Sequence, residues 1–165
     1  MSGSLRLGVL AGAFTVGVGA TVSLNACANF SSNIPQYATD AADIAAGLTH
    51  VVHDLELAKV IPPGTAVQVN AALVEANAAA GDVAKAPNAT AATNPVGTLA
   101  RDTNIILGAI SSAPNISLTD QEIAQAAGAL LPVLEASVGI VVPAGMPEAH
   151  ETAAQARDIL VPYAR

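Results

Sequence analysis

The sequence predicts an all-α protein: an antiparallel helical bundle of four to five alanine-rich helices that follows a cleaved N-terminal signal. Hydrophobic residues make up 52% of the 165 residues, but aromatic residues only 2%. Alanine has the highest helix propensity, and apolar residues recur three and four positions apart, which aligns them on one face of a helix. Because alanine side chains are small, we expect closely approaching helices around a thin core.

The first two helices are predicted on either side of a proline break. Residues 36–59 form the first, and its inward face comprises Ala41, Ile44, Leu48, Val51, Leu55 and Ala58. The stretch IPPG, residues 61–64, ends this helix because proline lacks the backbone donor and glycine tolerates the turn. The second helix is predicted to start after Thr65 and to run to about Lys85, with an inward face of Val69, Leu73, Ala76, Ala80 and Val83.

The third helix is predicted to follow a polar loop. Residues 86–95, APNATAATNP, are small and polar, and we expect them to be the most flexible segment of the bundle. Asn94 is the predicted N-cap and Pro95 the first helical residue, a position where proline is favoured. This helix should end before Pro114.

The fourth helix is predicted to start with a capping box. Thr119 and Glu122 have the spacing in which the hydroxyl and the carboxylate cap each other's backbone donors. Pro132 lies inside this helix and is expected to kink it. Residues 136–142, ASVGIVV, are compatible with either a helix or a short strand, and residues 147–161 form the last predicted helix.

The N-terminus has the layout of a secretory signal. Arg6 and the amino group provide positive charge, residues 7–24 are uncharged, and small residues precede the single cysteine, Cys27. A membrane-spanning helix is the competing interpretation, because the uncharged run approaches the roughly 18–20 residues that a bilayer requires. Its glycines and its polar end favour cleavage.

The four residues Leu24-Asn25-Ala26-Cys27 resemble the lipobox of bacterial lipoproteins, although Asn25 stands where Ser, Ala, Thr or Gly is usual. The resemblance covers residues 1–27 only. It implies that the Cys27 thiol is alkylated with diacylglycerol, that the signal is cut before it and that the new amino group is acylated. The implied organisation is a signal peptide at residues 1–26, a lipidated tether at 27–35 and a helical bundle domain at 36–165.

Lipidation implies a location in the cell envelope. Two or more acyl chains on Cys27 hold a protein at a membrane nearly permanently, without a spanning segment. By the same resemblance, Ala28 after the cysteine implies the outer membrane, facing the periplasm, in a Gram-negative cell. The rival cut uses Ala26-Cys27-Ala28 as an A-x-A site of ordinary signal peptidase. That cut would release a soluble protein that begins at Asn29.

The charge of the chain excludes some partners. The net charge is −7, and removal of residues 1–26 with Arg6 makes it more negative. Such a chain has no electrostatic footprint for nucleic acid or for anionic lipid head groups. We therefore predict attachment to the membrane via acylated Cys27.

Three histidines are the candidate metal ligands. His50, His53 and Asp54 lie within about one helical turn, and His150 in the last predicted helix could join them. A metal site needs three or four ligands, closed by a second element. The apolar face of the first helix directs His50 and His53 away from the core, so we interpret them as solvent-exposed and predict neither a metal site nor a cofactor.

No catalytic motif is present, and the protein is predicted not to be an enzyme. The sequence has no glycine-rich phosphate loop, nucleophile elbow or Cys/His pair. Paired carboxylates such as Asp40 and Asp43 are interpreted as a charged helix face.

The predicted function is a structural or accessory role in the envelope. A thin bundle gains stability when a partner covers its apolar surface, so we expect an envelope protein as the partner. The alternatives are a periplasmic helical bundle that binds a small molecule or a metal, and a prophage-encoded envelope protein. The resemblance to prophage proteins is one of composition only.

Overall fold

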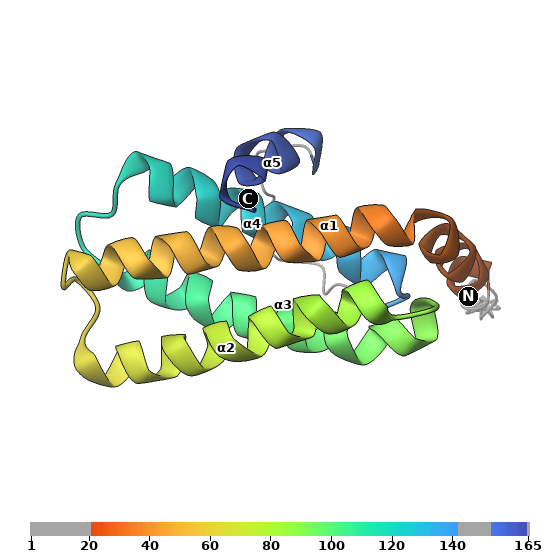
Figure 1. The fold of residues 1–165 in the computed structure, drawn as a ribbon, viewed down its shortest axis with the longest axis horizontal. Coiled ribbons are helices and arrows are strands. Elements are labelled where there is room, and N and C mark those ends of the chain that lie inside the picture. Colours follow the sequence, from red (N-terminus) through yellow and green to blue (C-terminus); the bar gives the residue numbers. More distant parts are fainter. Residues whose placement is uncertain (1–20, 142–152, 165) are drawn as a thin grey trace, which may run out of the picture.

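The computed structural model describes residues 21–141 and 153–164, and within them it contains helices and no strand (Figure 1). The predicted all-α helical bundle is confirmed. The elements are α1 (Thr21–Leu57), α2 (Pro63–Lys85), α3 (Ala89–Ser112), α4 (Leu118–Ser137), α5 (Ala153–Leu160) and the 3₁₀ turn η1 (Val161–Tyr163). None of these helices is both long enough and apolar enough to cross a bilayer.

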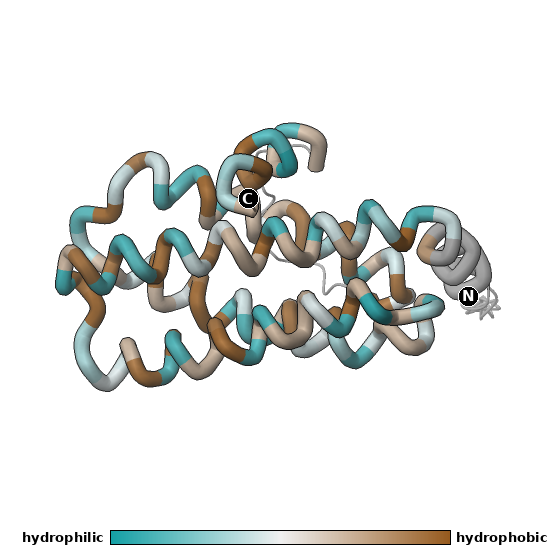
Figure 2. Tube along the Cα trace, in the orientation of Figure 1, coloured by the Kyte–Doolittle hydropathy of each residue, from teal (hydrophilic) through white to brown (hydrophobic). Residues whose placement is uncertain are grey.

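The first four helices run up and down in sequence order around one core (Figure 1). Each packs against the next, and α4 packs back against α1. Helices α1 and α3 also touch across the bundle, whereas α2 and α4 lie diagonally and do not touch. The short helix α5 covers a face of α1 and α4. Brown and teal segments alternate along each helix in Figure 2, as expected of helices with one buried face.

The core is as thin as the composition predicts. Fully buried alanines come from all five helices: Ala41, Ala76, Ala92, Ala126, Ala127 and Ala156. At Gly47 of α1, an added Cβ would lie 2.6 Å from Leu160 Cδ2 and 3.0 Å from Ile123 Cγ2. A side chain here would force Leu160 and Ile123 to shift, so glycine favours the close approach of α1, α4 and α5.

Helix α1 begins earlier than predicted. The predicted start was residue 36, but the helix runs from Thr21 and is interrupted once, at Asn33, where φ is −122° and ψ is 18°. Pro35 has no backbone N–H to donate to the preceding turn, which accounts for the break two residues before it. Phe30 is fully buried and stacks on Tyr37, with ring centroids 5.4 Å apart. The segment 27–35 is therefore helical on both sides of the break, and Phe30 packs into the core.

The predicted polar loop at 86–95 is wrong in its C-terminal part. Helix α3 starts at Ala89, and Asn88 is its N-cap: the Asn88 side chain accepts a hydrogen bond from the Ala91 backbone N–H at 2.9 Å. The helix extends this far because Ala89, Ala92 and Val96 are buried against the bundle. Pro95 lies inside the helix, where it removes a single backbone donor. The predicted end before Pro114 is confirmed.

The predicted cap of α4 is wrong by two residues. The N-cap is Ser117, not Thr119. The Asp120 backbone N–H donates to Ser117 Oγ at 3.0 Å, and Ser117 Oγ in turn donates to Asp120 Oδ2 at 2.7 Å. This arrangement requires Asp120 to face the bundle, and it is 5% exposed. Tertiary packing thus selects the cap among several candidate hydroxyl groups.

The chain after α4 turns without forming a strand in its described part. Helix α4 continues through Pro132 to Ser137, and Gly139 follows with φ +78°, a conformation that favours glycine. Of the predicted last helix, residues 153–160 are α5. Residues 147–152 lie outside the described part of the chain.

Candidate functional site

The structure describes only part of the predicted site residues. Cys27 lies in the N-terminal part of α1, but its side chain is outside the described part, and so is His150. His53 is exposed on α1, as predicted, and His50 is partly buried. The structure brings His50 together with Asp54, as the spacing predicted, and also with Asp120 of α4.

The His50 cluster consists of His50, Asp54 and Asp120. His50 Nε2 lies 3.5 Å from Asp54 Oδ2, one helical turn away. One imidazole nitrogen and one oxygen of each carboxylate all lie within 4.8 Å of one another. The antiparallel packing of α1 on α4 creates this group, because it sets the C-terminal half of α1 beside the first turn of α4. An imidazole and two carboxylates facing each other can bind a cation or share protons.

Asp120 is the buried member of the His50 cluster. Its Oδ2 accepts the hydrogen bond from Ser117, but its Oδ1 is buried and has no hydrogen-bond partner. A buried polar atom without a partner costs about 1–3 kcal/mol. Ser117 and Asp120 have the spacing of an N-terminal capping motif, which is a local signal for this arrangement. The prediction placed the cap at Thr119.

The C-terminal turn forms a wall beside the His50 cluster. The Tyr163 ring of η1 lies 4.7 Å from the His50 ring, centroid to centroid, at a tilt of 31°. On the other side the cluster is open, because the side chains of His50 and Asp54 are 39% and 41% exposed. The arrangement therefore has one buried oxygen, one packed imidazole and free access from solvent.

A second group of charges joins α5 to α1. Arg157 donates from Nε to Asp40 Oδ1 and from Nη2 to Asp40 Oδ2, both at 2.8 Å, and Gln36 donates to Asp40 Oδ1 at 2.8 Å. Asp40 is 0% exposed and Asp43 is 2% exposed. The prediction that Asp40 and Asp43 form a charged outer face is therefore wrong, because α5 covers that face of α1.

Asp43 makes the stability of the bundle dependent on pH. Burial raises its pKa above the ordinary 3.8; the negative charge of Asp40 raises it further, and Arg157 opposes the rise. The folded state thus holds this proton at a pH where the unfolded chain has released it. The stabilising effect of the proton is complete below the ordinary pKa and is lost as the pH rises through the raised pKa.

Asp43→Asn removes the titrating group with little change of shape. We expect the variant to gain stability relative to the wild type as the pH rises from about 4 to about 7. Urea unfolding followed by circular dichroism at several pH values measures this difference. A difference that stays constant with pH, or that shrinks as the pH rises, would show that the Asp43 carboxyl is not the cause.

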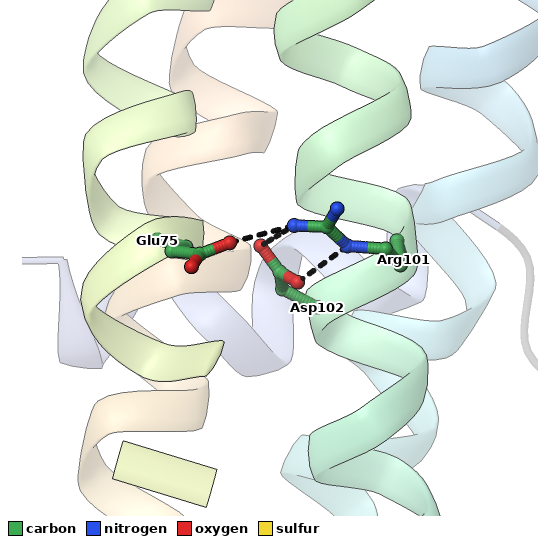
Figure 3. A network of polar contacts seen from close by, with 3 residues as sticks. All are labelled: Glu75, Arg101 and Asp102. Atoms are coloured by element: carbon green, nitrogen blue, oxygen red, sulfur yellow. Dashed lines mark hydrogen bonds and ion pairs between the residues drawn. The ribbon is translucent and has the colours of Figure 1, made fainter. Parts of the chain in front are cut away.

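A third group of charges joins α2 to α3, and Figure 3 shows its three members. Arg101 donates to both oxygens of Asp102, from Nε at 2.9 Å and from Nη2 at 3.3 Å, and also to Glu75 Oε2 of α2 at 2.6 Å. Asp102 is 2% exposed, so Arg101 neutralises a buried carboxylate. Arg101 pairs with both carboxylates of the group, and we interpret it as a structural contact between two helices.

Two of the three groups contain a buried carboxylate oxygen without a hydrogen-bond partner, and in the His50 cluster this atom, Asp120 Oδ1, has no Lys or Arg beside it among the described contacts. Asp43 Oδ2, which also lacks a hydrogen-bond partner, has Arg157 and Asp40 as charged neighbours. The chain was compared with protein-family models, with curated proteins and with solved structures, and no match was found.

Proposed function

We propose that the protein is a small envelope lipoprotein, held at a membrane by acylated Cys27, whose helical bundle has an accessory role through contact with another envelope protein. The observation that carries the attachment is the lipobox-like stretch Leu24-Asn25-Ala26-Cys27 behind an uncharged run. Two or more acyl chains suffice for stable anchoring. In Gram-negative bacteria, Ala28 favours the outer membrane.

The packing of α1 supports a short connection between lipid and bundle. Phe30 is fully buried and follows Cys27 by three residues in the same helix. At 1.5 Å per helical residue, an acyl chain on Cys27 would be about 5 Å along the helix from the core. The lipid would then hold this end of the bundle close to the membrane leaflet, without a flexible linker between them.

Cys27→Ser is the test of the attachment. In a bacterial host, we expect the wild-type chain to yield a membrane-bound species that begins at Cys27 and carries acyl mass. The variant should lack that species. Intact mass spectrometry of membrane and soluble fractions measures both. A species that begins at Asn29 in both proteins, or a wild type that retains residues 1–26, would contradict lipidation.

The outer face of α2 supports contact with a partner. Val67 and Val74 lie two turns apart and are 72% and 71% exposed, and the exposed Ala71 and Ala78 continue the same face. Exposed apolar surface of this kind often marks a protein interface. The net charge of −7 disfavours a second copy or an anionic membrane as the occupant. We therefore favour an envelope protein that offers an apolar helix face with basic residues at its rim.

A photo-crosslinking amino acid at Val74 tests this contact in cells. We expect one adduct of defined mass, lost when Val67 is also changed to Ser. The matched control replaces Gln125, which is exposed on α4, a helix that does not touch α2. An adduct of twice the protein's own mass would indicate self-association. That outcome, or equal adducts at Val74 and Gln125, would contradict the proposed partner.

A further inference from the structure

We infer that His50, Asp54 and Asp120 form a binding site for a divalent transition-metal ion of the zinc class. The site lies between the C-terminal half of α1 and the first turn of α4. The site does not depend on lipidation of Cys27. It goes beyond the proposed accessory role because it gives the bundle a metal ligand. Three features support the site: its donor set, its geometry and the buried oxygen of Asp120.

The donor set selects the class of metal. One imidazole nitrogen and two carboxylate oxygens are typical ligands of zinc and of neighbouring first-row ions. Calcium and magnesium take oxygen ligands, so the imidazole disfavours them. The site contains no sulfur ligand, which disfavours Cu(I). Three protein ligands leave a fourth tetrahedral position for water.

The geometry requires only a small contraction. Two ligand atoms at about 2.0–2.2 Å from a tetrahedral zinc ion are about 3.3–3.6 Å apart. The distance of 3.5 Å from His50 Nε2 to Asp54 Oδ2 already meets this condition. The third ligand atom lies within 4.8 Å of both. His50 and Asp54 are exposed enough to adjust their side chains, so the backbone of α1 and α4 need not move.

Asp120 is the fixed ligand around which the other two close. It is 5% exposed, Ser117 holds its Oδ2, and its buried Oδ1 has no partner. A hydrogen bond to the second oxygen of a ligating carboxylate is the usual way in which proteins orient such ligands. A bound cation would satisfy Oδ1 and neutralise two carboxylates that have no Lys or Arg partner among the described contacts.

Tyr163 connects the site to the C-terminus. Its ring packs on the His50 ring at 4.7 Å and restricts the imidazole. Metal binding at His50 should therefore also order the turn η1 that follows α5. Protection of this turn from proteolysis is a second signature of an occupied site.

The test is zinc titration of the full-length chain in detergent after removal of metals with a chelator. We expect one equivalent of Zn²⁺ to bind by calorimetry and to raise the melting temperature, with Mg²⁺ at the same concentration having no effect. His50→Gln and Asp54→Asn should each weaken binding at least tenfold. The matched control is His53→Gln on the same helix, which removes an exposed imidazole and should leave the affinity unchanged.

A further variant and a spectrum complete the test. Asp120→Asn should abolish the zinc-dependent rise in melting temperature, while circular dichroism of the metal-free variant checks that it is folded. Co²⁺ in place of zinc should give the absorption of a four-coordinate ion in the wild type and not in His50→Gln. Absence of saturable zinc binding, an equal response to Mg²⁺, or an equal loss in His53→Gln would overturn the site.

Discussion

Phe30→Ala is expected to lower the free energy of unfolding by about 3 kcal/mol, the usual cost of removing a fully buried phenylalanine side chain. Phe30 is 0% exposed and stacks on Tyr37. Aromatic residues make up only 2% of the chain, so the aliphatic and alanine neighbours cannot readily refill the space of a phenylalanine ring. Urea unfolding of the full-length chain, followed by circular dichroism, measures the change.

Leu57→Ala is the control for the Phe30 variant. Leu57 lies in the same helix and is 68% exposed, so its removal should change stability by less than about 0.5 kcal/mol. Equal effects of the two substitutions would mean that residues 27–35 act as a tether outside the cooperative bundle. A large effect confined to Phe30 would make this segment part of the folded domain and fix the distance between lipid and bundle.

The apolar spacing predicted the helices well wherever their faces are continuous. From Ala41 to Leu55 the predicted inward residues of α1 are buried, as are Val69, Ala76, Ala80 and Val83 of α2. Phe30 was missed because it stands alone among polar neighbours and gives no periodic signal. Its burial depends on the helices that meet there, and the local sequence does not encode their position.

The helix starts were predicted less well than the faces. Two asparagines could cap α3 and several hydroxyl residues could cap α4, and each candidate satisfies the same local rule. Asn88 prevails over Asn94 because Ala92 is buried and the earlier start keeps it in the helix. Caps are local hydrogen bonds of about 1 kcal/mol, so the burial of a whole helical turn decides between them.

The His50 cluster also shows that a local sequence pattern does not reveal contacts between helices. The spacing of His50 and Asp54 follows from one helix and was predicted. Asp120 could not be added, because its position depends on the register of α4 against α1. In that register Ile123 of α4 and Leu160 of α5 lie close to Gly47 of α1. The candidate ligands also included His150, which lies outside the described residues, but not the buried carboxylate of Asp120.

The second large effect is expected for Arg157→Ala, which should lower the free energy of unfolding by about 3 kcal/mol. Arg157 holds both oxygens of Asp40, which is fully buried. Removing one partner of a buried ion pair leaves an uncompensated charge, which costs about 3–5 kcal/mol. The lower end applies, because the Arg157 side chain is 30% exposed and water can reach this edge. Chemical unfolding near neutral pH measures the change.

Two further variants separate the buried charge from other effects of Arg157. Lys85→Ala removes an exposed ion pair, with Lys85 80% and Asp82 61% exposed, and should cost less than about 0.5 kcal/mol. Combining Arg157→Ala with Asp40→Asn removes the stranded charge, so the double variant should be more stable than Arg157→Ala alone. If it is not, α5 is held to the bundle by the packing of Leu160 and Ala156 rather than by the ion pair. The C-terminal wall of the His50 cluster would then depend on those apolar contacts, and zinc affinity would be insensitive to Arg157.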